Sequence, residues 1–157
     1  MEGTGRISAG GDWGGDKMSR DINQCVPALR TAWEKVKNEV LQEFGITIKL
    51  SYTSRTEIEQ VVFFLNDKLP VDLVNDVRKS FGMQPTINHG ELTKTLCSKH
   101  LTSRNQPLSR ALDFYIEKDG KPDWDDIDAY KKVGRWFENY GFSCLDEIHD
   151  YGHVEVR

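Results

Sequence analysis

The apolar residues of this 157-residue chain change their spacing several times, from the intervals of three and four typical of a helix to the alternation typical of a strand. The two patterns are mixed without the regular βαβ rhythm that would predict a parallel sheet. No internal repeat is visible. We therefore expect an α+β fold.

Four segments show helical spacing. The clearest is Pro27–Phe44, which starts with a proline suited to a first turn and is followed by Gly45, suited to a C-cap. A second helix is expected to start at a cap formed by Thr53 or Ser54, which would place Arg55 in its first turn. The four expected helices cover approximately residues 27–44, 54–65, 71–81 and 126–140.

Three segments have the composition of strands, at residues 46–52, 108–116 and 151–156. In the second of them, Leu112 and Phe114 should point to one side of the sheet and Asp113 to the other. Asp113 can therefore face a site while its neighbours face the core.

Composition narrows the class of protein. The chain is 38% hydrophobic and 29% charged, as soluble globular proteins are, and its net charge of -4 comes from interspersed acids and bases, which argues against a nucleic-acid partner. Its first residues contain no apolar run of the length that a signal peptide needs, and it has no apolar stretch of about 18 residues, so we expect neither a signal peptide nor membrane insertion. Three widely spaced cysteines favour a reducing compartment. The glycine-rich residues 1–17 are expected to be a flexible arm or a non-native remnant, followed by one domain over residues 18–157.

Two histidines and one aspartate could form a catalytic zinc site. Such a site usually takes three protein ligands and leaves one position for water. The candidates are His100, Asp113 and His153. Asp150 lies three residues before His153, close enough to act as a base without being a ligand.

These residues belong to motifs that occur in a fixed order. The motifs are Tyr52-Thr53-Ser54-Arg55-Thr56 with Gln60 after it, Ser98-Lys99-His100, Ala111-Leu112-Asp113 and Asp150-Tyr151-Gly152-His153. Over residues 22–156 this order resembles the zinc D,D-peptidases, which include D-alanyl-D-alanine carboxypeptidases and dipeptidases and phage L-alanyl-D-glutamate endolysins. The resemblance implies the hedgehog-like fold of that family, a small antiparallel sheet flanked by helices with the zinc site in a cleft.

The resemblance also implies roles for the site residues. One Zn²⁺ per chain would be held by the two histidines and the aspartate. Asp150 would accept a proton from the attacking water and pass it to the leaving amine. Arg55 would stabilise the oxyanion or anchor the substrate, a role that suits a permanently charged, fork-shaped donor. Gln60 and Ser98 would contact the substrate, although Ser98 is equally well explained as the cap of a local turn.

The chain departs from the family pattern between its first two ligands. The spacer Leu101–Leu112 is longer than the usual one and lacks the family's glycine. A loop insertion over Thr102–Leu108 accounts for the difference, because insertions add little closure entropy. Other assignments stay open nearby: Glu147 could replace Asp150 as the base, His149 competes with His153, and Arg110 could contact the substrate.

We therefore expect a zinc-dependent peptidoglycan peptidase that hydrolyses the L-Ala-D-Glu or D-Ala-D-Ala bond of stem peptides. The absence of a signal peptide favours a monomeric phage or prophage endolysin, made in the cytoplasm and released to the cell wall with a holin. One alternative is a non-catalytic, zinc-containing wall-binding or virion module, against which the intact Asp150 weighs. The other is an intracellular D-Ala-D-Ala dipeptidase.

Overall fold

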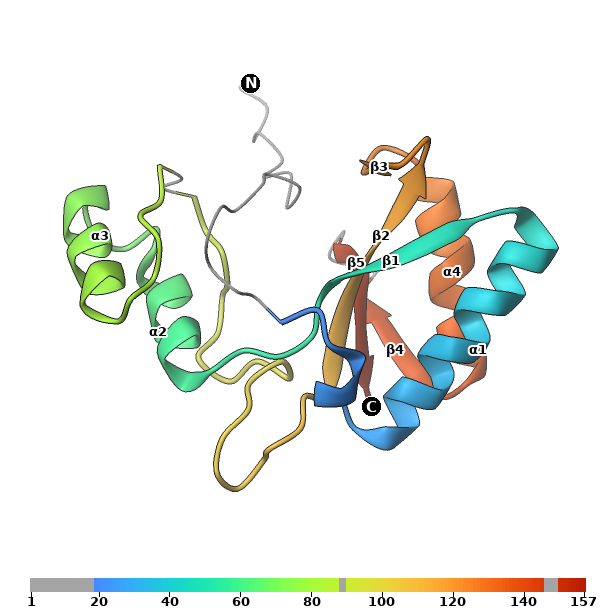
Figure 1. The fold of residues 1–157 in the computed structure, drawn as a ribbon, viewed down its shortest axis with the longest axis horizontal. Coiled ribbons are helices and arrows are strands. Elements are labelled where there is room, and N and C mark those ends of the chain that lie inside the picture. Colours follow the sequence, from blue (N-terminus) through green and yellow to red (C-terminus); the bar gives the residue numbers. More distant parts are fainter. Residues whose placement is uncertain (1–18, 88–89, 146–149) are drawn as a thin grey trace. The chain divides into compact units, whose positions relative to one another are not determined.

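The computed structural model describes residues 19–87, 90–145 and 150–157 (Figure 1). Its elements, in chain order, are η1 (Ile22–Gln24), α1 (Pro27–Phe44), β1 (Thr47–Tyr52), α2 (Glu57–Leu65), α3 (Val71–Ser80), β2 (Ala111–Lys118), β3 (Lys121–Asp123), α4 (Ile127–Asn139), β4 (Phe142–Leu145) and β5 (Asp150–Val156). Helices combined with a small antiparallel sheet confirm the expected α+β class. The arm expected at residues 1–17 lies outside the described residues.

The sheet has the strand order β1-β2-β5-β4, and β3 pairs with the end of β2. Every pair is antiparallel. Asp113 of β2 lies directly opposite His153 of β5 and, on its other side, opposite Tyr52 of β1. Two of the predicted ligands are therefore adjacent because of strand register alone.

The core lies between the sheet and the two helices α1 and α4 (Figure 1). Its fully buried side chains include Leu29 and Val36 of α1 and Val133 and Phe137 of α4. Strand β2 adds its alternate residues Leu112, Phe114 and Ile116. Asp113 is only half-buried and points to the other face, as strand parity predicted.

Local signals fix the ends of both core helices. Pro27 is the first residue of α1, and Gly45 ends it in the left-handed conformation, with φ of 65° and its N–H directed at the carbonyls of Val40 and Leu41. Helix α4 starts after Asp126, whose carboxylate accepts a hydrogen bond from the N–H of Ala129 at 3.0 Å. Both helices were predicted from the sequence.

The start of α2 was predicted wrongly. The helix begins at Glu57, so Arg55 lies before it and not in its first turn. The N–H of Arg55 donates to the carbonyl of His100, and the carbonyl of Arg55 accepts from the N–H of Thr102. Together these two bonds form a short parallel bridge between Arg55 and Leu101. These long-range bonds hold Arg55 in an extended conformation.

Strand β4, which pairs with β5, was not predicted from the sequence.

The described residues form two compact units. One is Ile58–Leu96, in which the side chain of Asn75 pairs with both backbone groups of Thr86 and Arg78 is buried. The other contains the sheet, α1 and α4.

Among the described helices, none has the length and apolar character that a membrane crossing requires.

Candidate metal centre

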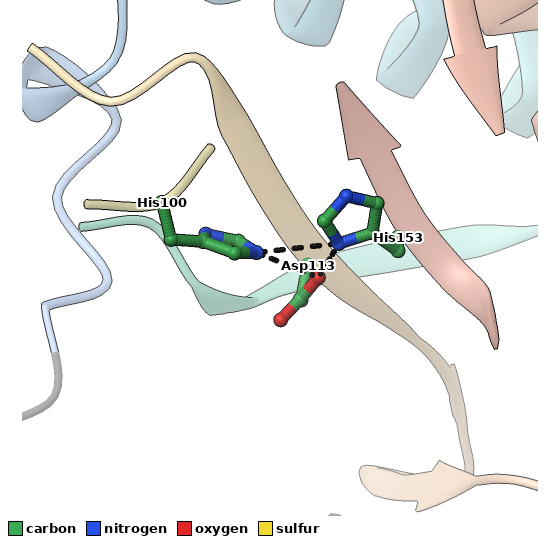
Figure 2. A group of neighbouring side chains, drawn as sticks. All are labelled: His100, Asp113 and His153. Carbon is green, nitrogen blue, oxygen red and sulfur yellow. Dashed lines mark hydrogen bonds and ion pairs between the residues drawn. The ribbon is translucent and has the colours of Figure 1, made fainter. Parts of the chain in front are cut away.

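His100, Asp113 and His153, the three predicted ligands, converge at one point (Figure 2). His100 Nε2 lies 3.2 Å from Asp113 Oδ1 and 3.3 Å from His153 Nδ1. His153 Nδ1 lies 2.9 Å from the same Asp113 oxygen. The side chains of His100 and His153 are 3% and 10% exposed, whereas that of Asp113 is 30% exposed. Solvent therefore reaches the group from the side of the carboxylate.

Backbone bonds place His100 beside the two strand residues. Its carbonyl accepts the N–H of Arg55 at 2.9 Å, and Arg55 in turn accepts the N–H of Thr102 at 2.8 Å. At the other end of the irregular segment 102–108, Ser109 bridges to Cys25. Both ends of the predicted insertion are thus fixed to other parts of the chain, so the longer spacer does not separate the ligands.

Each histidine ring has a hydrogen-bond acceptor behind it. His100 Nδ1 lies 2.8 Å from the carbonyl oxygen of Thr53, and His153 Nε2 lies 3.0 Å from Glu155 Oε2. A carbonyl or carboxylate oxygen can only accept, so these ring nitrogens carry the hydrogens. The opposite nitrogens, His100 Nε2 and His153 Nδ1, face Asp113. They donate to its carboxylate when protonated, and they would turn their lone pairs towards a metal ion once it had displaced those protons.

The ionisable side chains of the group change one another's pKa. Burial acts to raise the pKa of Asp113, but the two histidines outweigh it and hold this pKa well below its usual range. Burial acts to lower the pKa of His153, but hydrogen bonds to Asp113 and Glu155 raise it to about 10. The hydrogen bond from His153 lowers the pKa of Glu155 to about 2. The centre therefore favours a positive charge, supplied by a proton or a metal ion.

The geometry fits a metal ion. Nitrogen and oxygen ligands about 2.0 to 2.2 Å from a tetrahedral ion lie roughly 3.3 to 3.6 Å from one another. The three ligand atoms here are 2.9 to 3.3 Å apart. Small movements would therefore open the group around an ion, and three protein ligands would leave one coordination position for another molecule.

Asp150, the predicted base, is the first residue of β5, on the strand that carries His153. The residue is exposed to solvent, but the protein around its carboxylate still removes part of the water that would stabilise the charge. This loss of hydration, followed by the negative charge of Asp113, raises the pKa of Asp150. The alternatives Glu147 and His149 lie outside the described residues.

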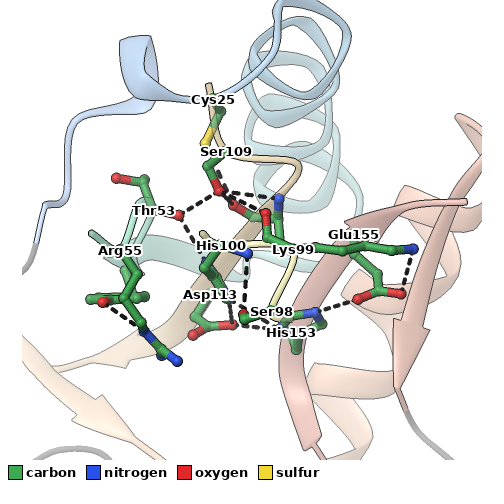
Figure 3. Close-up of polar contacts among 12 residues, drawn as sticks. Cys25, Thr53, Arg55, Ser98, Lys99, His100, Ser109, Asp113, His153 and Glu155 are labelled. Carbon is green, nitrogen blue, oxygen red and sulfur yellow. Dashed lines mark hydrogen bonds and ion pairs between the residues drawn. The ribbon is translucent and has the colours of Figure 1, made fainter. Parts of the chain in front are cut away.

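Arg55, labelled in Figure 3, is connected to the metal group through Tyr52. Its Nε donates to the Tyr52 hydroxyl at 2.9 Å, and its guanidinium lies 4.9 Å from the centre of the Tyr52 ring. The same ring packs edge-on against His100, with 5.2 Å between ring centres. The guanidinium is thus held beside the centre without being a ligand.

The other two predicted substrate contacts have structural partners. Ser98 Oγ accepts the N–H of His100 at 3.2 Å, which is the local-turn role considered for it. Gln60 is buried in the unit Ile58–Leu96, where its amide donates to the carbonyl of Thr95. Contact of either residue with a substrate stays a prediction.

Sequence reasoning missed the residues that support the histidines. Glu155 could have been found, because it lies two positions after His153 and so points to the same face of the strand. Lys99, which pairs with Glu155, is adjacent to His100. Thr53 acts through its backbone carbonyl, and no side-chain pattern signals that role.

No protein-family model matches the chain, and no curated protein is detectably similar to it. Membership of the zinc D,D-peptidases therefore stays a prediction from four short motifs in order.

Proposed function

We propose that the protein is a zinc-dependent peptidase that hydrolyses a stem-peptide bond of bacterial peptidoglycan. The observation that supports this most is the convergence of two imidazole nitrogens and one carboxylate oxygen within 3.3 Å of one another. With Asp150 on the same strand, the arrangement has the parts of a hydrolytic metal site.

Zinc fits this donor set better than calcium or magnesium does. Imidazole nitrogen with a single carboxylate is a typical zinc environment, whereas calcium and magnesium prefer oxygen ligands alone. When bound, zinc polarises a peptide carbonyl and makes water a better nucleophile near neutral pH. We propose one Zn²⁺ per chain, and the cleft expected around it stays a prediction.

The chain's own residues would divide the remaining work. Asp150 accepts a proton from the attacking water and delivers it to the leaving amine. Its raised pKa suits that exchange, because a general base works best when its pKa approaches the working pH. Arg55, held by Tyr52, stabilises the oxyanion or binds a substrate carboxylate.

The proposed substrate is the wall peptide, cut at L-Ala-D-Glu or D-Ala-D-Ala, and the proposed role is that of a monomeric phage or prophage endolysin that reaches the wall with a holin. This part rests on the family resemblance. The exposed edge of Asp113 is consistent with access by a large substrate.

Two measurements test the proposal. Elemental analysis of purified protein should find one zinc per chain, absent from His153→Ala. Zinc-loaded protein incubated with purified peptidoglycan should release peptides whose new end groups identify the bond. Asp150→Asn should keep the zinc and lose the hydrolysis.

Other outcomes would redirect the proposal. Protein that binds wall fragments and zinc without cutting them would be a binding module. Cleavage of free D-Ala-D-Ala but not of the wall would indicate a dipeptidase. Protein that binds no zinc would overturn the proposal as a whole.

A further inference from the structure

A carboxylate and an amine lie behind His153, on the side away from the other two ligands (Figure 3). Glu155 Oε2 is 3.0 Å from His153 Nε2, and its other oxygen, Oε1, is 2.9 Å from Lys99 Nζ. Lys99 also donates to the carbonyl of Val156 at the end of the same strand. Glu155 is therefore held at both oxygens, which fixes its plane relative to the imidazole.

Strand geometry gives the pair its position. His153 and Glu155 are two residues apart in β5 and so point to the same face of the sheet. Lys99 comes from the segment that carries His100, and its carbonyl accepts the N–H of Arg110 just before β2. One residue thus connects the His100 segment, the start of β2 and the end of β5.

We infer that Glu155, held in place by Lys99, is a positioning residue that keeps His153 in the Nε2–H tautomer and aims its Nδ1 lone pair at the bound metal. The inference rests on the proposed metal site. A hydrogen bond from the far ring nitrogen fixes both the tautomer and the ring orientation of a metal-binding histidine, and removing such a partner typically weakens metal binding about 10- to 100-fold.

The two histidines are supported differently. His100 donates to a backbone carbonyl, that of Thr53, which no side-chain substitution removes. His153 depends on side chains, and these are partly shielded from water: Glu155 is 19% exposed and Lys99 31%. Substitution of Glu155 should therefore act on one ligand only.

The test is zinc affinity, measured by competition with a chelator of known affinity. We expect Glu155→Ala to weaken binding about 10- to 100-fold and Glu155→Gln to weaken it less, since the amide oxygen still accepts from Nε2–H. Lys99→Met should weaken binding in the wild-type background and have no further effect in Glu155→Ala. The matched control is the looser pair Lys49–Glu117 of the same sheet, 3.9 Å apart. Glu117→Ala should bind zinc as the wild type does.

Nitrogen-15 NMR of the zinc-loaded wild type tests the tautomer directly, even if Glu155→Ala does not fold. His153 should carry its hydrogen on Nε2 and His100 on Nδ1. The opposite tautomer at His153, or wild-type affinity in both Glu155 variants, would overturn the inference and leave the proposed zinc site intact. A wild type that binds no zinc would instead overturn the proposed function.

Discussion

Gly152 precedes His153 in β5, where the strand passes close to the backbone of β2. A Cβ atom on Gly152 would lie 2.5 Å from the carbonyl oxygen of Phe114, closer than real Cβ atoms come to an oxygen. Gly152→Ala should therefore push β5 away from β2, lowering the free energy of unfolding by about 1 to 3 kcal/mol and weakening zinc binding. Denaturant unfolding and chelator competition would measure both effects.

The control for this substitution is Gly82→Ala, which adds the same methyl group where no atom lies within 4 Å. Its positive φ of 71° imposes a backbone penalty, but Gly82 is in the unit that lacks the site, so zinc affinity should not change. Equal zinc affinity in Gly152→Ala and wild type would show that the close approach does not position His153.

The cysteines differ in a way that alkylation can measure. Burial is the main cause that raises the pKa of Cys25 to about 12, and its thiol donates to the carbonyl of Ala111, whereas Cys97 is exposed. The thiolate is the reactive form, so in folded protein at pH 8 iodoacetamide should modify Cys97 and spare Cys25. Because the pKa of Cys25 is higher in the folded than in the unfolded chain, the buried thiol makes its full contribution to stability below the unfolded pKa of about 9. That contribution is lost as the pH rises towards the folded pKa of about 12. Rapid modification of Cys25 at pH 8, located by mass spectrometry, would contradict its burial.

At the scale of elements, the sequence predicted a helix correctly wherever residues typical of helix ends mark both ends of the segment. Helix α1 was predicted from Pro27 to Phe44 because both ends are marked in the sequence. The start of α2 was missed because the backbone of Arg55 pairs with His100 and Thr102, far along the chain. Strand β4 was missed because it is only four residues long and depends on pairing with β5, so its own sequence shows no strand pattern.

The capping residue of α4 provides a test at this scale. Asp126 accepts the N–H of Ala129, and its removal leaves that donor without its side-chain partner. Asp126→Ala should cost about 1 kcal/mol, a fall in Tm of about 2 to 4 °C for a chain of this size, while Asp126→Asn should retain most of the stability. Asp125→Ala removes the adjacent carboxylate and is the control; an equal loss in both variants would assign the effect to charge and not to capping.

At the scale of the whole molecule, the site joins segments that are distant in sequence. His100, Asp113 and His153 were identified as a group through ordered motifs, and strand parity added Asp113. The supporting residues were not identified, because the carbonyl of Thr53 and the reach of Lys99 to Glu155 depend on how the loop after Arg55 folds back. The candidate ligands can thus be predicted from side-chain types, whereas the residues that orient them depend on the tertiary structure.

All three proposed ligands and the residues that support them belong to the unit that contains the sheet. The proposed zinc site therefore predicts where zinc removal should act. A ligand that binds only the folded state stabilises it by about 2.7 kcal/mol at a free concentration of 100 times its Kd. Chelation should therefore lower Tm and speed amide exchange in β2 and β5, where Asp113 pairs with His153. Exchange in α3, whose unit is held by its own contacts between Asn75 and Thr86, should change little. Amide hydrogen exchange with and without a chelator measures the change in each unit, with His153→Ala as the metal-free reference. Equal acceleration of exchange in both units would show that they unfold together.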